Sequence, residues 1–212
     1  MAERMKRTNG AARPAKAWTG AGGVHPMDGG AAGRGFLLDD ERAPGVRALL
    51  GYLLSRAEAA DIAVRRVRLA ALDFSAAELG SVRECRVLLG GLDAAALIDA
   101  AAAARLDPHR AAPVSALRDL LSGGRAAIRS AGTCRWVPDF AIVRGLPADG
   151  PVTGAACLSG WLGLDVRDDG AGTALTTMIA GSTAAAAATH RFEALWSDAY
   201  DVLPVVLRAL EP

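Results

Sequence analysis

The run Cys85-Arg86-Val87-Leu88-Leu89-Gly90 is the feature that most limits what this chain can fold into. It is short, densely apolar and ends in glycine, which is typical of a strand covered on both faces of a sheet. Asp93 follows as a capping residue for an alanine-rich helix that we expect to extend to about Ala104. The run therefore predicts a sheet with helices packed on its faces.

Other segments give the remaining elements of such a fold. The apolar positions of residues 44–57 recur at helical spacing, and Pro44 suits the first turn of a helix. Residues 62–72 alternate in two phases, which predicts a strand with a bulge near Arg65 and Arg66. A short helix over 115–121 is closed by Gly123-Gly124. Further strands are predicted at 125–130, 140–143, 154–158 and 174–180.

The C-terminal segment is helical by its period. Phe192, Leu195, Trp196 and Ala199 keep the helical spacing, and the pattern continues past Pro204, which should kink the helix or divide it. The order of these elements predicts an α/β fold, with a mixed β-sheet flanked by helices.

At 212 residues the chain has the length of one larger domain. Residues 1–34 are rich in Gly, Ala, Arg and Lys and have no apolar period, so we expect a disordered N-terminal tail before a single domain over 35–212. The basic residues of the tail are either solvated or available to touch nucleic acid. A later true start at Met27 is an open alternative.

Composition limits the class of partner and the compartment. The net charge is +1, which gives no global attraction to nucleic acid or an anionic membrane. No apolar stretch approaches the roughly 18 to 20 residues that cross a bilayer, and the first residues do not resemble a secretory signal. We therefore expect a cytoplasmic protein that does not insert into membranes.

Cysteine and histidine do not form a metal-binding pattern. Cys85, Cys134 and Cys157 lack CxxC spacing, and we interpret them as buried small hydrophobes. His25, His109 and His190 have no ligand spacing to one another or to a cysteine. The sequence predicts no metal and no cofactor.

Three places in residues 36–210 resemble the phospholipase D-like superfamily, especially its short single-copy members and the degenerate versions fused to bacterial regulators. They are the strand Cys85 to Gly90 before a helix; the block from Ile128-Arg129-Ser130 to Pro138-Asp139-Phe140-Ala141-Ile142-Val143; and the ending His190-Arg191-Phe192-Glu193-Ala194-Leu195-Trp196-Ser197-Asp198-Ala199. The resemblance implies a phospholipase D-like arrangement of the sheet and helices.

The same resemblance implies that catalysis has been lost. Active members carry His-x-Lys on the strand where this chain has Pro138 and Phe140, and no lysine follows Lys16. That chemistry needs a nucleophilic imidazole and a cation for the phosphoryl oxygens. We expect no catalytic residue here; His190 and Asp139 are the weak candidates. The favoured interpretations are a solvated residue at the start of the last helix for His190 and a turn or capping residue for Asp139.

Arginine is the main candidate for ligand binding. If the side chains of arginines on or beside the predicted strands converge, their guanidinium groups form a basic pocket suited to phosphate or carboxylate. The alternative is that they pair with Asp61, Asp73, Glu78 and Glu84. Asp165 lies near the acidic position of the family motif, as the resemblance implies. The candidate ligand-binding residues are Arg66, Arg68, Arg129, Arg135, Ser159 and Asp165.

Three hypotheses for function follow. The first is a catalytically degenerate phospholipase D-like domain that serves as a binding or accessory module for a phosphate-containing ligand, nucleic acid or a partner protein. The second is a phosphodiesterase or nuclease with a rearranged site built from His190, Arg135 and Asp139. The third is a structural subunit that forms a homodimer through its final helix.

Overall fold

The computed structural model describes residues 24–27, 34–38, 44–65, 82–90, 98–99, 102, 118–132, 137–150, 152–160, 162 and 176–211. Its helices are α1 (Pro44–Leu54), α4 (Ser182–Ser197) and α5 (Leu203–Leu210), with shorter helical pieces at 98–99, 102 and 118–122. Its strands are β1 (Val24–Met27), β2 (Arg34–Leu38), β3 (Ala59–Val64), β4 (Glu84–Leu89), β5 (Ala126–Ser130), β6 (Phe140–Leu146), β7 (Gly154–Gly160), β8 (Thr176–Ala180) and β9 (Tyr200–Asp201).

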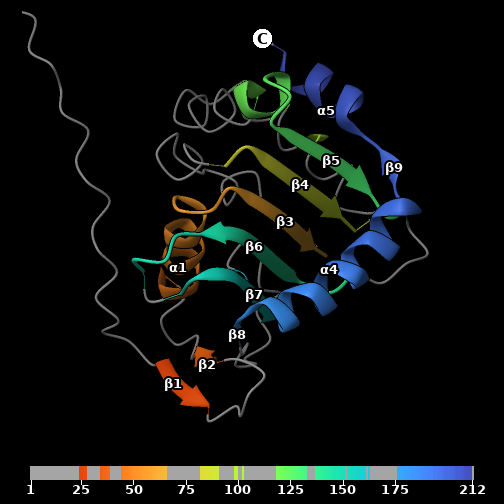
Figure 1. The fold of residues 1–212 in the computed structure, drawn as a ribbon. Coiled ribbons are helices and arrows are strands. Elements are labelled where there is room, and N and C mark those ends of the chain that lie inside the picture. The colour runs from red at the N-terminus through yellow and green to blue at the C-terminus, as the bar shows by residue number, and fades with distance from the viewer. Residues whose placement is uncertain are drawn as a thin grey trace, which may run out of the picture.

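The described strands form one mixed sheet of nine strands in the order β1-β2-β8-β7-β6-β3-β4-β5-β9 (Figure 1). Its centre contains the parallel neighbours β3, β4 and β5. Every other neighbouring pair is antiparallel, including β3 with β6 and β5 with β9. The prediction of a mixed sheet flanked by helices is confirmed.

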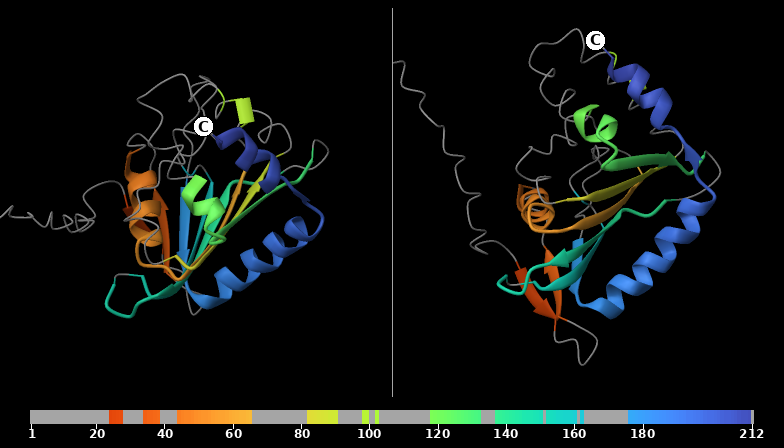
Figure 2. Two further views of the ribbon diagram at one scale, coloured as in Figure 1. Left: turned by 90° about the horizontal axis from the view of Figure 1, so that it is seen from above. Right: turned by 45° about the horizontal axis from the view of Figure 1, so that its top comes forward.

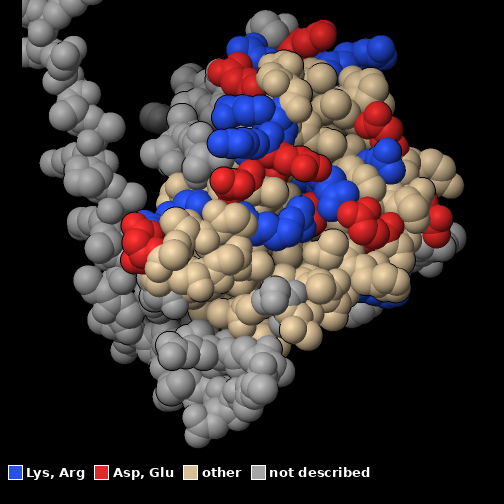
Figure 3. Space-filling view, in the orientation of Figure 1, with Lys and Arg blue, Asp and Glu red and all other residues tan. Residues whose placement is uncertain are grey.

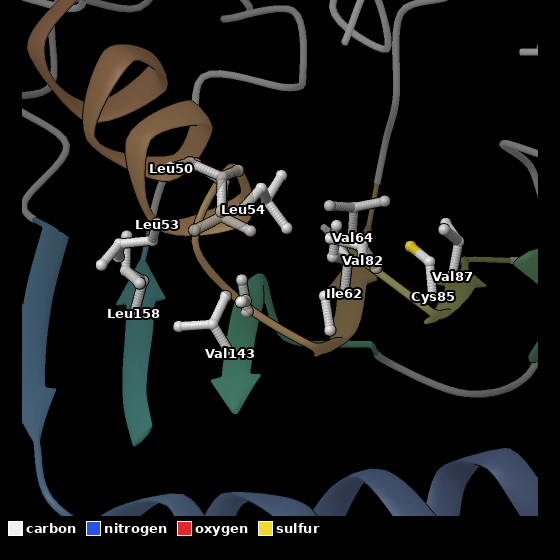
Figure 4. Close-up of a cluster of buried hydrophobic side chains, with 14 of the residues drawn as sticks. Leu50, Leu53, Leu54, Ile62, Val64, Val82, Cys85, Val87, Val143 and Leu158 are labelled. Atoms are coloured by element: carbon white, nitrogen blue, oxygen red, sulfur yellow. The ribbon is translucent and has the colours of Figure 1, made fainter. Parts of the chain in front are cut away.

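Helices cover both faces of this sheet (Figure 2). On one face, α1 and α5 pack over strand residues such as Ile62 and Val64, and Figure 4 shows Leu50, Leu53 and Leu54 of α1 directed at the strands. On the other face, α4 buries a second core that includes Ala63, Leu88, Phe140, Ile142, Cys157, Ala185, Phe192 and Leu195. Alternation along each strand divides its side chains between these two cores.

Most of the predicted elements are present. The helical spacing of residues 44–57 corresponds to α1, and the dense apolar run corresponds to β4. The four later strand predictions correspond to β5, β6, β7 and β8. A turn at Gly123 and Gly124 closes the helical piece at 118–122, and Gly124 has a φ of 67°, a conformation that favours glycine.

Three expectations are wrong in detail. The predicted strand over 62–72 begins earlier, at Ala59, and ends at Val64; Arg65 has left the strand, and residues 66–81 lie outside the described part of the chain. The tail predicted for 1–34 contains β1, which pairs with β2. Composition could not reveal this strand, because its partners are set by the sheet as a whole: β2 pairs in turn with the distant strand β8.

The C-terminal segment is divided into two helices, α4 and α5, which is one of the two outcomes predicted for Pro204. The division falls at the short strand β9, and Pro204 lies in the first turn of α5. The third correction concerns the position of His190. His190, expected at the start of the last helix, lies in the middle of α4 because the alanines at 184–188 are also helical. Among the described residues, no helix is both long and apolar enough to cross a membrane.

Candidate functional site

Asp61 is a fully buried carboxylate near the middle of the sheet, with 0% of its surface exposed. It lies on β3, and strand alternation places it on the α4 face beside Ala63, whereas Ile62 and Val64 face α1. Burying an ionised carboxylate is costly unless it is paired and hydrogen-bonded. The fold must therefore supply cations at this point.

Two arginines on the strands at either side of β3 supply that charge. Arg86 on β4 is directly opposite Asp61 in the parallel register, and it donates from Nε to Oδ1 over 2.6 Å and from Nη2 to Oδ2 over 2.9 Å. Arg144 on β6 is paired with Ala59, two residues before Asp61 on the same face of β3, and it donates from Nη1 to the same Oδ2 atom. Asp61 is thus held by one bidentate and one single arginine contact.

This pairing decides the charge state of the site. Burial alone would raise the pKa of Asp61, but the hydrogen bonds from Arg86 and Arg144 outweigh it and hold that pKa below its ordinary value. The hydrogen bonds to Asp61 in turn raise the pKa of Arg86. The Asp61 carboxylate and the Arg86 guanidinium are therefore both charged at neutral pH.

Arg86 also links the sheet to α4. Its Nη2 atom lies 2.7 Å from Oε1 of Glu193, and its guanidinium carbon lies 4.9 Å from the ring centre of Phe192 and 5.6 Å from that of Trp196. Cations over aromatic faces are attracted by the ring quadrupole. We call Asp61, Arg86, Arg144 and Glu193 the Asp61 network.

A second arginine continues this arrangement along α4. Arg129 on β5 lies 4.8 Å from the ring centre of Trp196 and donates from Nη1 to the Trp196 carbonyl over 2.9 Å. Phe192 and Trp196 are stacked at 5.4 Å between ring centres, and Phe140 meets Phe192 edge to face at 6.2 Å. Arginines and aromatic rings therefore join α4 to three strands.

The network opens onto a charged surface. In Figure 3, arginines and acidic residues alternate in a band over the strands on the side of the sheet that carries α4. The side chain of Arg86 is 16% exposed, that of Arg144 30% and that of Glu193 50%. Water and small solutes can thus reach the outer end of the network, while Asp61 stays dry.

The structure describes only some of the residues predicted to bind a ligand. Arg129 contacts Trp196, as above, and Ser159 is exposed on β7 opposite Phe140 and Thr177. Arg66, Arg68, Arg135 and Asp165 lie outside the described residues. The pairing expected between arginines and Asp61 is found for Arg86.

The two weak catalytic candidates differ in their surroundings. His190 is exposed on α4, whereas Asp139 is half buried before β6, and its Oδ1 accepts a hydrogen bond from the Arg65 backbone N–H over 2.5 Å. Neighbouring Phe140 is only 5% exposed and packs against Phe192.

Sequence reasoning missed the central residues of this site. Asp61 was weighed only as an ion-pair partner of surface arginines, and Arg144 was not considered. The available signal was the single charge in the otherwise apolar strand Ala59–Val64. A lone charge between buried positions indicates a paired group, although it does not identify the partner.

Metal and thiol chemistry find little support in this part of the chain. The described residues contain no group of three or more His, Cys, Asp or Glu side chains placed to hold a metal ion. Cys85 and Cys157 are free and buried, as expected, and burial raises the pKa of Cys85 to about 12 and that of Cys157 to about 11. Cys134 lies outside the described residues.

Comparisons with known proteins find similarity among solved structures. No protein-family model matches the chain, and no curated protein matches it. Among solved structures with a similar backbone is TrmBL2, described as an archaeal chromatin protein with a novel mode of DNA binding. The TM-score is 0.48 at 13% sequence identity, over 79% of this chain and 54% of TrmBL2, so the chain spans about half of that protein's length.

Proposed function

We propose that this chain is a catalytically degenerate phospholipase D-like domain that binds a phosphate-containing ligand as an accessory module. The observation that carries the proposal is the environment of Phe140. The resemblance assigns the two functional positions of His-x-Lys to Pro138 and Phe140, and Phe140 is buried edge to face against Phe192. An aromatic ring that closes the core takes the place of a group that would hold phosphoryl oxygens.

The two described residues of the alternative site, His190 and Asp139, have different surroundings. Displacement at phosphorus by a side chain needs a nucleophile and a neighbouring base, within about 3 Å of each other. His190 is exposed on α4, and Asp139 accepts a backbone hydrogen bond from Arg65. The alternative, a phosphodiesterase that uses His190, Arg135 and Asp139, is therefore the less favoured function.

Binding is favoured over a purely structural role by the arginines that remain. Arg86, Arg129 and Arg144 reach the α4 face from three strands, and none of them is fully buried. Guanidinium groups offer forked donors that match phosphate oxygens. A domain that has lost its nucleophile but keeps such donors can bind the ligand without cleaving it.

Hydrolysis of a chromogenic phosphodiester tests this proposal. We expect the purified protein, without added metal, to release no more chromophore than its His190→Ala variant or the buffer. Turnover that is lost in the His190→Ala variant would overturn the proposal and favour the rearranged enzyme. A parallel assay of fluorescence anisotropy with labelled DNA measures whether nucleic acid is the ligand.

A further inference from the structure

The Asp61 network is a chain of alternating charges with one open end. Glu193 Oε1 contacts Arg86 Nη2, Arg86 Nη2 contacts Asp61 Oδ2, and Asp61 Oδ2 contacts Arg144 Nη1. Since both arginines donate to one carboxylate oxygen, their guanidinium groups are adjacent. The order of charges is carboxylate, guanidinium, carboxylate, guanidinium, and it ends on Arg144.

Arg144 has donors to spare at that end. An arginine carries five N–H donors, and within the described part of the chain the Arg144 side chain uses Nη1 for Asp61. Its side chain is 30% exposed, so part of it is in contact with solvent. An anion bound beside Arg144 would continue the alternation of negative and positive charges along the network.

Glu193 is the member of the network that is most easily moved. It is 50% exposed, it lies on a helix rather than on the sheet, and among the described residues its ion pair is with Arg86. Half-exposed ion pairs are weak because water competes for both charges. Arg86, by contrast, is also held by a bidentate contact with buried Asp61.

We propose that a small molecule with a phosphate monoester group binds across Arg86 and Arg144, and that Glu193 occupies the Arg86 side of this site until the ligand displaces it. The proposal rests on the proposed function and names its site. With Glu193 displaced, Asp61, Arg86 and Arg144 carry two positive charges and one negative charge. A phosphate dianion has enough oxygens to accept from both guanidinium groups.

The surface around the site favours a small ligand over nucleic acid. Affinity for a nucleic-acid backbone comes from several phosphates neutralised along a basic surface. On the face of Figure 3 that carries α4, acidic residues alternate with the arginines, and the whole chain has a net charge of only +1. Acidic neighbours repel a long polyanion but leave room for one compact dianion.

Calorimetric titration with inorganic phosphate and with phenyl phosphate tests the site. We expect Glu193→Gln to tighten binding by about threefold or more, because the competing carboxylate is removed. We expect Arg144→Gln to weaken it by about tenfold or more, because a charge-assisted contact is lost. The matched controls Asp119→Asn and Arg118→Gln, on the separate helical piece at 118–122, should leave binding unchanged.

The use of two variants keeps the test valid even if one of them misfolds. Arg144→Gln removes a partner of a buried carboxylate, so its fold is checked by circular dichroism. Glu193→Gln leaves the Asp61–Arg86 pair intact and is informative by itself. The proposal is supported if Glu193→Gln binds phosphate more tightly than the parent protein does, and if labelled DNA binds no more tightly than phosphate.

Three results would overturn it. The first is that neither the parent protein nor Glu193→Gln binds phosphate. The second is that Glu193→Gln and Arg144→Gln both leave the phosphate affinity unchanged. The third is that the protein binds DNA more tightly than phosphate and that this binding depends on Arg144. Unchanged affinity in both variants would remove this site but leave the proposed function standing. Phosphodiester turnover lost in His190→Ala would remove the function whatever the binding data show.

Discussion

Replacing Asp61 by asparagine keeps the shape of a fully buried side chain but removes its charge. Three hydrogen bonds from Arg86 and Arg144 then lose their ionic character, and the new amide group brings N–H donors against guanidinium donors. Removing one partner of a buried ion pair costs about 3–5 kcal/mol. Since Arg144 is 30% exposed and keeps part of its hydration, we take the lower end, about 3 kcal/mol.

Urea and thermal unfolding measure this loss. At roughly 2–4 °C per kcal/mol for a protein of this size, the Tm of Asp61→Asn should fall by roughly 6–12 °C, and the urea midpoint should fall with an unchanged slope. The matched control is Asp149→Asn at the pair formed by Arg56 and the exposed Asp149, where we expect a change below about 1 kcal/mol. Equal stability of Asp61→Asn and the parent protein would refute the reasoning.

A double-mutant cycle separates pairing from burial in the same network. Asp61→Asn and Arg144→Gln each break the shared contact, so their combined effect on the free energy of unfolding should be smaller than the sum of the two. Additive losses would mean that the Arg144 contact contributes nothing to stability.

Three further predictions follow from the buried groups. Pairing lowers the pKa of Asp61 in the folded state, so the stability that this carboxylate contributes is present above its unfolded pKa of about 3.9 and is lost as pH falls toward its folded pKa. Urea titrations should therefore show that the difference in unfolding free energy between the parent protein and Asp61→Asn becomes smaller below about pH 4. Phe192→Ala should lower the free energy of unfolding by about 3–5 kcal/mol, because this ring is fully buried in the core beneath α4. The control Val205→Ala, at an exposed position, should change it by less than about 0.5 kcal/mol. Equal effects of the two substitutions would contradict the burial of Phe192. Burial keeps Cys85 and Cys157 as protonated thiols, so iodoacetamide at pH 8 should leave both unmodified until the protein is unfolded, as measured by peptide mapping. Rapid labelling of either cysteine in the native protein would argue against its burial.

Local pattern was sufficient for the elements that carry their own signal. The leucines of α1 repeat at helical spacing, and β4 is a dense apolar run, so each could be recognised from its own residues. β1 has no such pattern. Its formation depends on pairing with β2, which in turn pairs with β8, and short-range periodicity contains no information about partners so far apart in sequence.

The candidate site shows the same division. The sequence by itself determined that no lysine after Lys16 could serve a His-x-Lys motif, and that Asp61 is a lone charge beside apolar residues. Only the tertiary structure decided that β4 and β6 lie on either side of β3, which brings Arg86 and Arg144 to one oxygen of Asp61, and that α4 crosses the same face with Glu193. The reason is physical: backbone hydrogen bonds join any two strands, so the order of strands is selected by the packing of the whole sheet and its helices rather than by the residues of one segment.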